Sequence, residues 1–409
     1  MRLAVFLLLA STGCRPHDDS AAPDSTPVDD SSPVLDTQDT QDTAPPDDTC
    51  AKVALTSLLA ADGAPLVRGA MGGQEIWFAV DTAAQVVFAD LEVSGGSTEY
   101  FETSLQVGPY DEESFLVKGR DLTLNQESLG VDVGGLLGWS ILQTSWTAVD
   151  SATPAVYLCD HEPAHPPPGA FGPAQPVTFE LQNLFPVVAL DVGTGWGVSL
   201  MVDDGLPVTV ITQSVFDALR NPGPQVPGWV FSSNYGSDPA FLVRVPGFDF
   251  GAEHVDSAVL AVIPEDHHLK AILEGSDVHV AGFLGNDLLS RVLWSLTSDG
   301  VGGAFTTWPL EGGWGDDPNL WVRVGLDVAW RDGVFVVDKV LKGSSAALQG
   351  VAVGDVLVGI DGVDSATLDR TAVLAALAGE AGEVRHLDLT RGGSALAVDV
   401  EVEELVPGG

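Results

Sequence analysis

Two aspartates, Asp81 and Asp203, occupy matched positions in two separate parts of the chain. Each ends an apolar run, IWFAVD in the first case and VSLMVD in the second, and such runs are typical of buried strands. Some tens of residues later each is followed by an apolar pair closed by glycine, LLG ending at Gly138 and FLG ending at Gly285. The duplication predicts two matched lobes that each contribute one carboxylate to an acid-base site.

Two carboxylates held about 3 Å apart cannot both ionise, so they share one proton and their apparent pKa values separate. The ionised carboxylate takes a proton from a water that attacks a carbonyl carbon, while the protonated one donates to the carbonyl oxygen. This chemistry requires no cofactor and no metal. Because the proton is shared, the sequence does not say which of Asp81 and Asp203 holds it.

An apolar strand, then Asp-Thr/Ser-Gly, then a later apolar-apolar-Gly resembles the signature of the retropepsin- and pepsin-like aspartic proteases. The resemblance covers residues 50–310 and implies two β-barrel lobes with Asp81 and Asp203 as catalytic residues. It also implies endopeptidase activity on extended polypeptides that lie across the two aspartates. Gly138 and Gly285 would support the catalytic loops, since only glycine lets two backbone segments approach so closely.

Two positions depart from this family pattern. Ala83 stands where the first motif usually has glycine, and Asp204 replaces the hydroxyl residue that normally clamps one loop to the other; Thr82 and Gly205 keep the pattern. Asp204 adds a like charge beside the pair, which raises pKa values. These departures motivate an alternative, a catalytically decayed lipoprotein that acts as a peptide- or protein-binding scaffold. A third possibility is one competent lobe that pairs with its copy in a dimer.

A hairpin that covers the substrate is expected between each aspartate and its later glycine. The candidates are LQVGPYDEE at 105–113, with Tyr110, and FSSNYGSDPAF at 231–241, with Tyr235. The alternative is that both tyrosines are plain turn residues.

The sequence pattern predicts a mainly β protein, because short β-branched and aromatic runs alternate with Gly, Pro, Asp and Asn clusters. We expect a first lobe over 50–160, a proline-rich linker over 161–176 and a second lobe over 177–310. A third unit, over 320–405, contains the run GSSAALQGVAVGDVLVGIDG, which closely resembles the core of bacterial PDZ domains. The resemblance implies a partly open β-barrel with one or two helices that accepts a C-terminal peptide as an added strand. Val334, Phe335 and Val336 would line the groove; the alternative is that this strand only packs the core.

The N-terminus predicts export and lipid anchoring. Arg2, an apolar run to Ala10 and the sequence LLASTGC make residues 1–13 a signal peptide and resemble a bacterial lipobox, with Cys14 as the acylated residue. Arg15 follows Cys14 at the position where an inner-membrane retention signal would place aspartate, so we expect the outer membrane. Residues 14–49 are rich in Asp, Thr and Pro and predict a disordered tether. The alternative is a soluble secreted protein.

The charge, the cysteines and the histidines of the chain give three further expectations. Basic residues number 17 against 58 acidic ones, a net charge of −41, which disfavours nucleic acid as a partner. With Cys14 assigned to lipid, an oxidising compartment favours a disulfide between Cys50 and Cys159. The eight histidines, including the adjacent His267 and His268, lack metal-ligand spacing and are interpreted as solvated loop residues.

Overall fold

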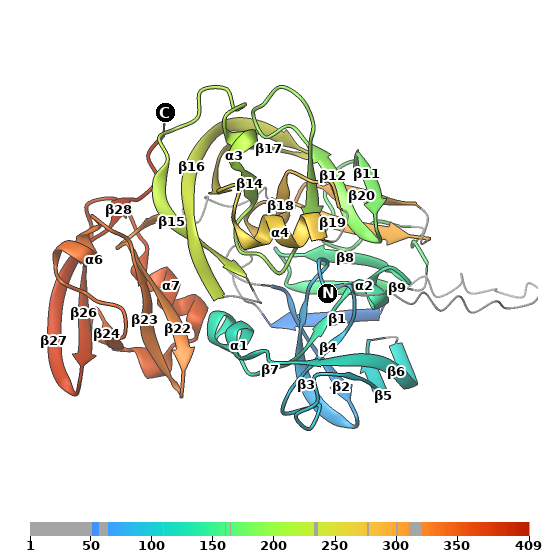
Figure 1. Ribbon diagram of the computed structural model, residues 1–409, viewed down its shortest axis with the longest axis horizontal. Coiled ribbons are helices and arrows are strands. Elements are labelled where there is room, and N and C mark those ends of the chain that lie inside the picture. Colours follow the sequence, from blue (N-terminus) through green and yellow to red (C-terminus); the bar gives the residue numbers. More distant parts are fainter. Residues whose placement is uncertain are drawn as a thin grey trace, which may run out of the picture. The chain divides into compact units, whose positions relative to one another are not determined.

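The computed structural model describes residues 51–56, 64–108, 110–159, 161–163, 165–232, 236–275, 278–299, 302–310 and 321–408. Strands dominate it and its helices are short (Figure 1), so the predicted mainly β class is confirmed. Among these residues no helix combines the length and apolar character needed to cross a membrane. The predicted signal peptide, the tether, Cys14 and Cys50 lie outside the described residues.

In the described part of the first lobe there are nine strands and two short helices. They are β1 (Ala51–Thr56), β2 (Leu66–Met71), β3 (Gln74–Val80), β4 (Phe88–Asp90), β5 (Tyr100–Val107), β6 (Tyr110–Arg120), α1 (Thr123–Leu129), β7 (Val133–Leu137), α2 (Trp139–Leu142), β8 (Trp146–Asp150) and β9 (Ala155–Cys159).

The second lobe repeats this plan. Its elements are β10 (Gln175–Val177), β11 (Phe179–Gln182), β12 (Phe185–Leu190), β13 (Val198–Val202), β14 (Val210–Thr212), α3 (Gln213–Phe216), β15 (Val226–Ser232), β16 (Gly236–Phe250), β17 (Glu253–Ile263), α4 (His268–Gly275), β18 (Gly282–Leu284), α5 (Asn286–Leu289), β19 (Leu293–Ser298) and β20 (Gly303–Trp308).

The two lobes share one local topology around the predicted aspartates. In the first lobe β7 runs between β3 and β4, parallel to β3 and antiparallel to β4. In the second lobe β18 runs in the same way between β13 and β14. The strands that carry LLG and FLG therefore lie directly beside the strands that end at the two aspartates.

A continuous sheet joins the lobes. Strand β8 of the first lobe pairs antiparallel with β19 of the second, so Ser295 lies opposite Ala148. Residues 175–177, at the end of the predicted linker, form β10 and pair with β20 in the same sheet. The segment between the lobes is thus integrated into the sheet at its C-terminal end.

The third unit is a small β-structure with short helices. It comprises β21 (Val322–Arg323), β22 (Leu326–Arg331), β23 (Val334–Val340), α6 (Ser345–Leu348), β24 (Val356–Ile360), β25 (Val363–Asp364), the 3-10 helix η1 (Ser365–Thr367), α7 (Arg370–Leu377), β26 (Val384–Arg391), β27 (Ser394–Glu401) and β28 (Glu403–Glu404). The main sheet has the order β22-β23-β24-β26-β27, so β22 is one edge strand.

The third unit packs against the second lobe. Leu341, Leu405 and Val406 belong to the same buried apolar cluster as second-lobe residues such as Val208. Arg244 on β16 donates from Nε to the carbonyl oxygen of Val406 at 2.9 Å. Hydrophobic burial and a hydrogen bond therefore hold this contact together.

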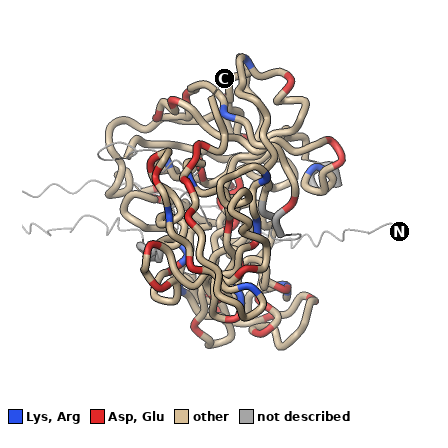
Figure 2. Tube along the Cα trace, turned by 90° about the vertical axis from the view of Figure 1, so that its left-hand side faces the viewer, with Lys and Arg blue, Asp and Glu red and all other residues tan. Residues whose placement is uncertain are grey.

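Acidic positions lie throughout the traced chain, with few basic ones between them (Figure 2). This distribution agrees with the net charge of −41 and with an anion-repelling surface.

Candidate active site

Asp81 follows β3 immediately and sits in a tight turn. Its backbone N–H donates to the carbonyl oxygen of Leu137 at 3.0 Å, so β7 fixes the start of the turn. Its carboxylate Oδ1 accepts hydrogen bonds from the N–H groups of Ala83 at 3.0 Å and Ala84 at 2.9 Å. These two donors hold the carboxyl in one orientation and favour its ionised form.

Asp203 follows β13 in an equivalent turn. Its N–H donates to the carbonyl oxygen of Leu284 at 3.0 Å, and its Oδ1 accepts from the N–H of Gly205 at 3.1 Å. Leu284 precedes Gly285 as Leu137 precedes Gly138, so each turn rests on the matched apolar-apolar-Gly strand. The two loops therefore share the same backbone bond to the apolar-apolar-Gly strand and the same bond from the N–H two positions after the aspartate to its Oδ1.

The glycines of these strands are required by close backbone approach. A methyl group at Gly138 would collide with the carbonyl oxygen of Val86, and one at Gly285 with the backbone of Val208. Both obstacles are main-chain atoms that cannot rotate away. Just beyond Gly285, Asp287 Oδ1 accepts from the N–H and the hydroxyl of Thr209, both at 2.7 Å, which ties the end of β18 to β14.

The structure brings the carboxyl groups of Asp81 and Asp203 to one small space. A methyl group built on Gly205 would lie 3.2 Å from Oδ1 of Asp203 and 3.3 Å from Cγ of Asp81. Both carboxyls therefore border the same point, and the negative charge of Asp81 helps to raise the pKa of Asp203.

Thr82 and Asp204 fasten one loop to the other. The Thr82 hydroxyl donates to the carbonyl oxygen of Val202 at 2.8 Å and accepts from the N–H of Asp204 at 3.3 Å. The Thr82 N–H donates to Oδ1 of Asp204 at 2.8 Å. The carboxylate of Asp204 thus accepts the hydrogen bond that a hydroxyl residue was expected to accept.

The second oxygen of Asp204 has no such partner. The residue is fully buried, and Oδ2 has no hydrogen-bond partner among the described residues. Burial raises the pKa of Asp204 to about 7, against the lowering effect of the Thr82 N–H. Below neutral pH this carboxyl is therefore mainly neutral, so it adds a full negative charge beside the pair only at higher pH.

Arg120, at the end of β6, makes the pair electrostatically unequal. Burial raises the pKa of Asp81, but the positive charge of Arg120 opposes that rise. Burial raises the pKa of Asp203 well above its usual value, and the charges of Asp81 and Asp204 add to the rise. The pKa of Asp203 is therefore raised more strongly than the pKa of Asp81. No motif in the sequence pointed to Arg120; a lone arginine 39 positions after Asp81 carries no spacing signal.

Ala83 is accommodated without loss of the loop hydrogen bonds. Its N–H bonds Asp81 as that of Gly205 bonds Asp203, and its side chain packs against the apolar cluster of the second lobe. Neither Ala83 nor Gly205 has a positive φ, so the turn does not demand glycine at this place.

The first predicted covering hairpin exists as β5 and β6, which pair antiparallel. Tyr110 opens β6, and its hydroxyl shares a hydrogen bond of 2.9 Å with the hydroxyl of Thr144, just after α2. A role of Tyr110 over the aspartates stays a prediction. In the second lobe β15 and β16 form the corresponding hairpin, and Tyr235 lies outside the described residues.

The predicted peptide groove needs a correction. Strand β23, which contains Val334, Phe335 and Val336, is paired with β22 on one side and with β24 on the other. Phe335 is buried in the core of the third unit. An added strand needs a free edge, which β23 does not offer; the edge strands of this sheet are β22 and β27. The sequence argument failed because strand order within a sheet is a tertiary property.

Cys159 ends β9 and is buried. Strand β9 pairs antiparallel with β1, with Leu158 opposite Ala51, the residue that follows Cys50. This register favours the Cys50–Cys159 disulfide, which stays a prediction because Cys50 lies outside the described residues.

The adjacent histidines are not solvated loop residues, so that interpretation was wrong. His267 is only 7% exposed, stacks on His268 with ring centroids 4.4 Å apart, and lies close to Asp238 of β16. Its Nδ1 accepts from the N–H of Leu269 at 3.2 Å, which places the proton of the neutral ring on Nε2. Protonated Nε2 is a hydrogen-bond donor rather than a metal ligand, and Nδ1 of His268 lies 3.1 Å from Asp238. The Nε2 atom of His267 is buried and has no hydrogen-bond partner among the described residues, so within this cluster only the contact of His268 with Asp238 joins polar side-chain atoms.

Comparisons with known proteins identify the third unit. Residues 336–391 match the family model of the PDZ domain. Among solved structures, a photosystem II D1 C-terminal processing protease is similar over 21% of this chain and 24% of that protein, with 23% identity and a TM-score of 0.20. So low a TM-score carries no argument about activity. No curated protein matches the chain. The chain therefore carries a PDZ domain, a fold that binds peptides, and the resemblance of the lobes to aspartic proteases stays a hypothesis.

Proposed function

We propose that this protein is an aspartic endopeptidase that hydrolyses peptide bonds with a water activated by Asp81 and Asp203. The observation that carries the proposal is the pairing of the two Asp loops: their carboxyls border one point beside Gly205, and Thr82 and Asp204 hydrogen-bond across the seam. Two equivalent loops that meet in this way support one shared proton better than two independent carboxylates.

The electrostatics support separate roles for the two residues. Asp81, beside Arg120, is the ionised partner that takes the proton from the attacking water. Asp203, with the more strongly raised pKa, is the acid that donates to the carbonyl oxygen of the substrate. The tetrahedral intermediate formed by water attack then breaks its C–N bond: Asp81 gives the proton that it took from the water to the leaving nitrogen. The hydroxyl formed from the carbonyl oxygen returns its proton to Asp203 as the carbonyl re-forms, so the pair is restored.

The test is hydrolysis of an unfolded, fluorescently labelled protein by the purified chain at pH 4 to 7. Asp81→Asn and Asp203→Asn should each lower the rate by about 10³-fold or more, since removal of one member disables the pair. The control is Asp256→Asn, which changes an exposed aspartate on β17, outside both predicted covering hairpins. Activity that survives in both active-site variants would refute the mechanism.

The alternative is a peptide- or protein-binding scaffold that has lost catalysis. Asp204 favours it, because a carboxyl with an unpartnered buried oxygen replaces the usual hydroxyl clamp. A transition-state mimic of the pepstatin type distinguishes the two functions. Tight binding that is lost in Asp203→Asn supports the protease; binding of peptides without binding of the mimic supports the scaffold.

We further propose that the protein is anchored through an acylated Cys14 to the outer membrane and that its PDZ domain recruits C-terminal peptides of substrates. The lipobox-like LLASTGC supports the anchor. Incorporation of a fatty-acid label into the wild type, and its loss in Cys14→Ser, tests the anchor; equal labelling of both proteins would refute it. Fractionation of the two bacterial membranes tests the location, and recovery in the inner-membrane fraction would overturn it.

A further inference from the structure

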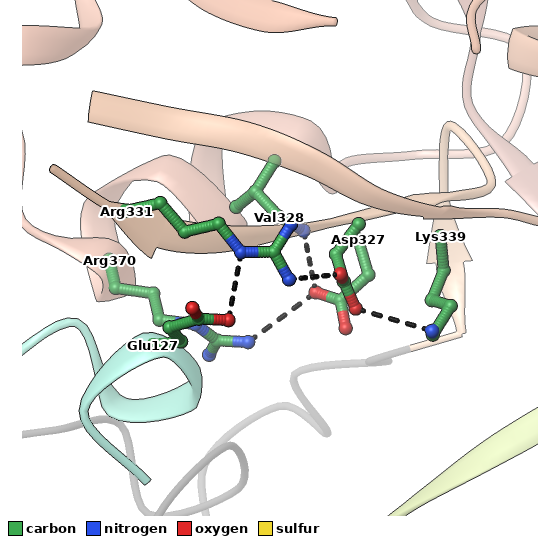
Figure 3. A network of polar contacts seen from close by, with 7 residues as sticks. Glu127, Asp327, Val328, Arg331, Lys339 and Arg370 are labelled. Atoms are coloured by element: carbon green, nitrogen blue, oxygen red, sulfur yellow. Dashed lines mark hydrogen bonds and ion pairs between the residues drawn. The ribbon is translucent and has the colours of Figure 1, made fainter. Parts of the chain in front are cut away.

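The PDZ domain contacts the first lobe through α1, the seven-residue helix between β6 and β7. On the helix, Glu127 Oε2 accepts from Nε of Arg331 at 2.8 Å, and Arg331 is the last residue of β22 (Figure 3). At the end of the helix, a methyl group on Gly130 would lie 2.9 Å from Cβ of Arg370, the first residue of α7. Helix α1 thus touches both β22 and α7.

These two elements are the walls between which a PDZ domain accepts its peptide. Strands β22 and β27 are the two edges of the sheet, and β22 is the one that an ion pair joins to α7, so it is the strand along which a peptide would pair. Arg370 on α7 reaches across to Asp327 on β22, with Nη2 and Oδ1 3.4 Å apart (Figure 3). A peptide laid on β22 would meet both this ion pair and the first-lobe helix.

The charges around Arg331 indicate which kind of peptide could take the place of α1. Arg331 donates from Nε to Glu127 of the first lobe and from Nη2 to Asp338 of β23 at 2.7 Å, so its guanidinium binds two carboxylates at once. A peptide that displaces α1 removes one of them, and an acidic side chain on the peptide would restore it.

The helix is also connected to the candidate active site. It starts three residues after Arg120, whose charge acts on Asp81, and β7 follows it and ends at Leu137, which accepts the hydrogen bond from the Asp81 N–H. The PDZ domain is itself packed on the second lobe through Arg244 and the shared apolar cluster. The α1 contact therefore makes the PDZ domain a bridge between the two lobes.

We propose that α1 occupies the peptide-binding groove of the PDZ domain from within the chain. A ligand peptide with a free C-terminus and an acidic residue upstream competes with α1 for β22 and Arg331. Its binding releases the first lobe from the PDZ domain and removes one of the links between the lobes. The peptide competes with α1 for the groove whether or not the protein is an enzyme. Any effect of this release on the access of substrate to Asp81 and Asp203 rests on the proposed protease function.

The binding test uses the full chain and random ten-residue peptides with free C-termini, selected on Glu127→Gln and then measured by fluorescence anisotropy. Glu127→Gln should bind the best peptide about two- to five-fold more tightly than the wild type, the effect of one half-buried ion pair. Glu113→Gln, an equal charge change at an exposed position of β6, should leave affinity unchanged. The selected peptides should be enriched in Asp or Glu, and Arg331→Gln should remove that preference.

Hydrogen exchange gives a second reading that does not depend on affinity. Saturating peptide should increase exchange of the α1 amides in the wild type, because the helix loses its cover. Equal affinity of wild type and Glu127→Gln together with unchanged α1 exchange would overturn the proposal, as would the absence of any binding peptide. If peptide binding exposes α1 but no variant hydrolyses protein, the occluded groove stands and the protease function fails.

Discussion

Replacement of Asp204 by asparagine should make the protein more stable at neutral pH. The residue is fully buried, its Oδ1 accepts from the Thr82 N–H at 2.8 Å, and its Oδ2 has no hydrogen-bond partner among the described residues. Asparagine keeps an oxygen acceptor for Thr82 and replaces the other oxygen by an uncharged amide group.

The magnitude follows from the pKa. The carboxyl has a pKa of about 7 in the folded protein against 3.8 as its ordinary value, roughly three units at about 1.4 kcal/mol each. Full ionisation thus costs at most about 4 kcal/mol of folding free energy. The hydrogen bond from Thr82 is weaker to a neutral amide by about 1 kcal/mol, so a net gain of about 1–3 kcal/mol is expected at pH 7.5.

The direction with pH follows from proton binding. A carboxyl with a raised folded-state pKa binds its proton more tightly when the protein is folded. Its stabilising effect is complete below pH 4 and is lost as pH rises through 7. The wild type should therefore lose stability between pH 4 and 7.5, and Asp204→Asn should lose less.

The assay is urea unfolding of the wild type and Asp204→Asn at pH 4 and pH 7.5, with Asp111→Asn as the exposed control. The advantage of the Asp204 variant should appear at pH 7.5 and be small at pH 4. An equal difference at both pH values, or a variant less stable at pH 7.5, would refute the account of Asp204 as a buried carboxyl that strains the interlobe contact on ionisation.

The other predictions concern the same loops. Thr82→Val should cost about 2–4 kcal/mol of unfolding free energy, measured by urea denaturation, because the buried carbonyl of Val202 and the buried N–H of Asp204 both lose the Thr82 hydroxyl as their partner. A loss below about 0.5 kcal/mol would contradict this. Arg120→Gln should raise the pKa of Asp81 and shift the acid limb of the pH-rate profile to higher pH. An acid limb at the same pH would show that the charge of Arg120 does not affect the pKa of Asp81. Gly205→Ala should reduce hydrolysis with little loss of stability, because its methyl group would crowd both carboxyls; unchanged kcat/KM would contradict that geometry. Cys159 should resist alkylation in denatured, unreduced protein and react after reduction, as the proposed disulfide requires.

Local patterns predicted much of the lobes because they encode local geometry. An apolar run that ends in aspartate predicts a buried strand and a polar turn, and both Asp81 and Asp203 follow strands in this way. The glycines of LLG and FLG predict close backbone approach, and Gly138 and Gly285 both lie against carbonyl groups. Asp204 was recognised as a departure from pattern, although its role as acceptor for Thr82 was not.

The sequence by itself determined the mainly β class, the duplicated Asp loops and the PDZ-like third unit, because strand periodicity and turn residues act over a few positions. Only the tertiary structure decided that Arg120 acts on Asp81, that His267 is buried, that β22 rather than β23 offers a free edge, and that α1 contacts β22. Each of these depends on which segments the fold places side by side. The local sequence pattern of a strand is compatible with many strand partners, so it does not specify which segments become neighbours.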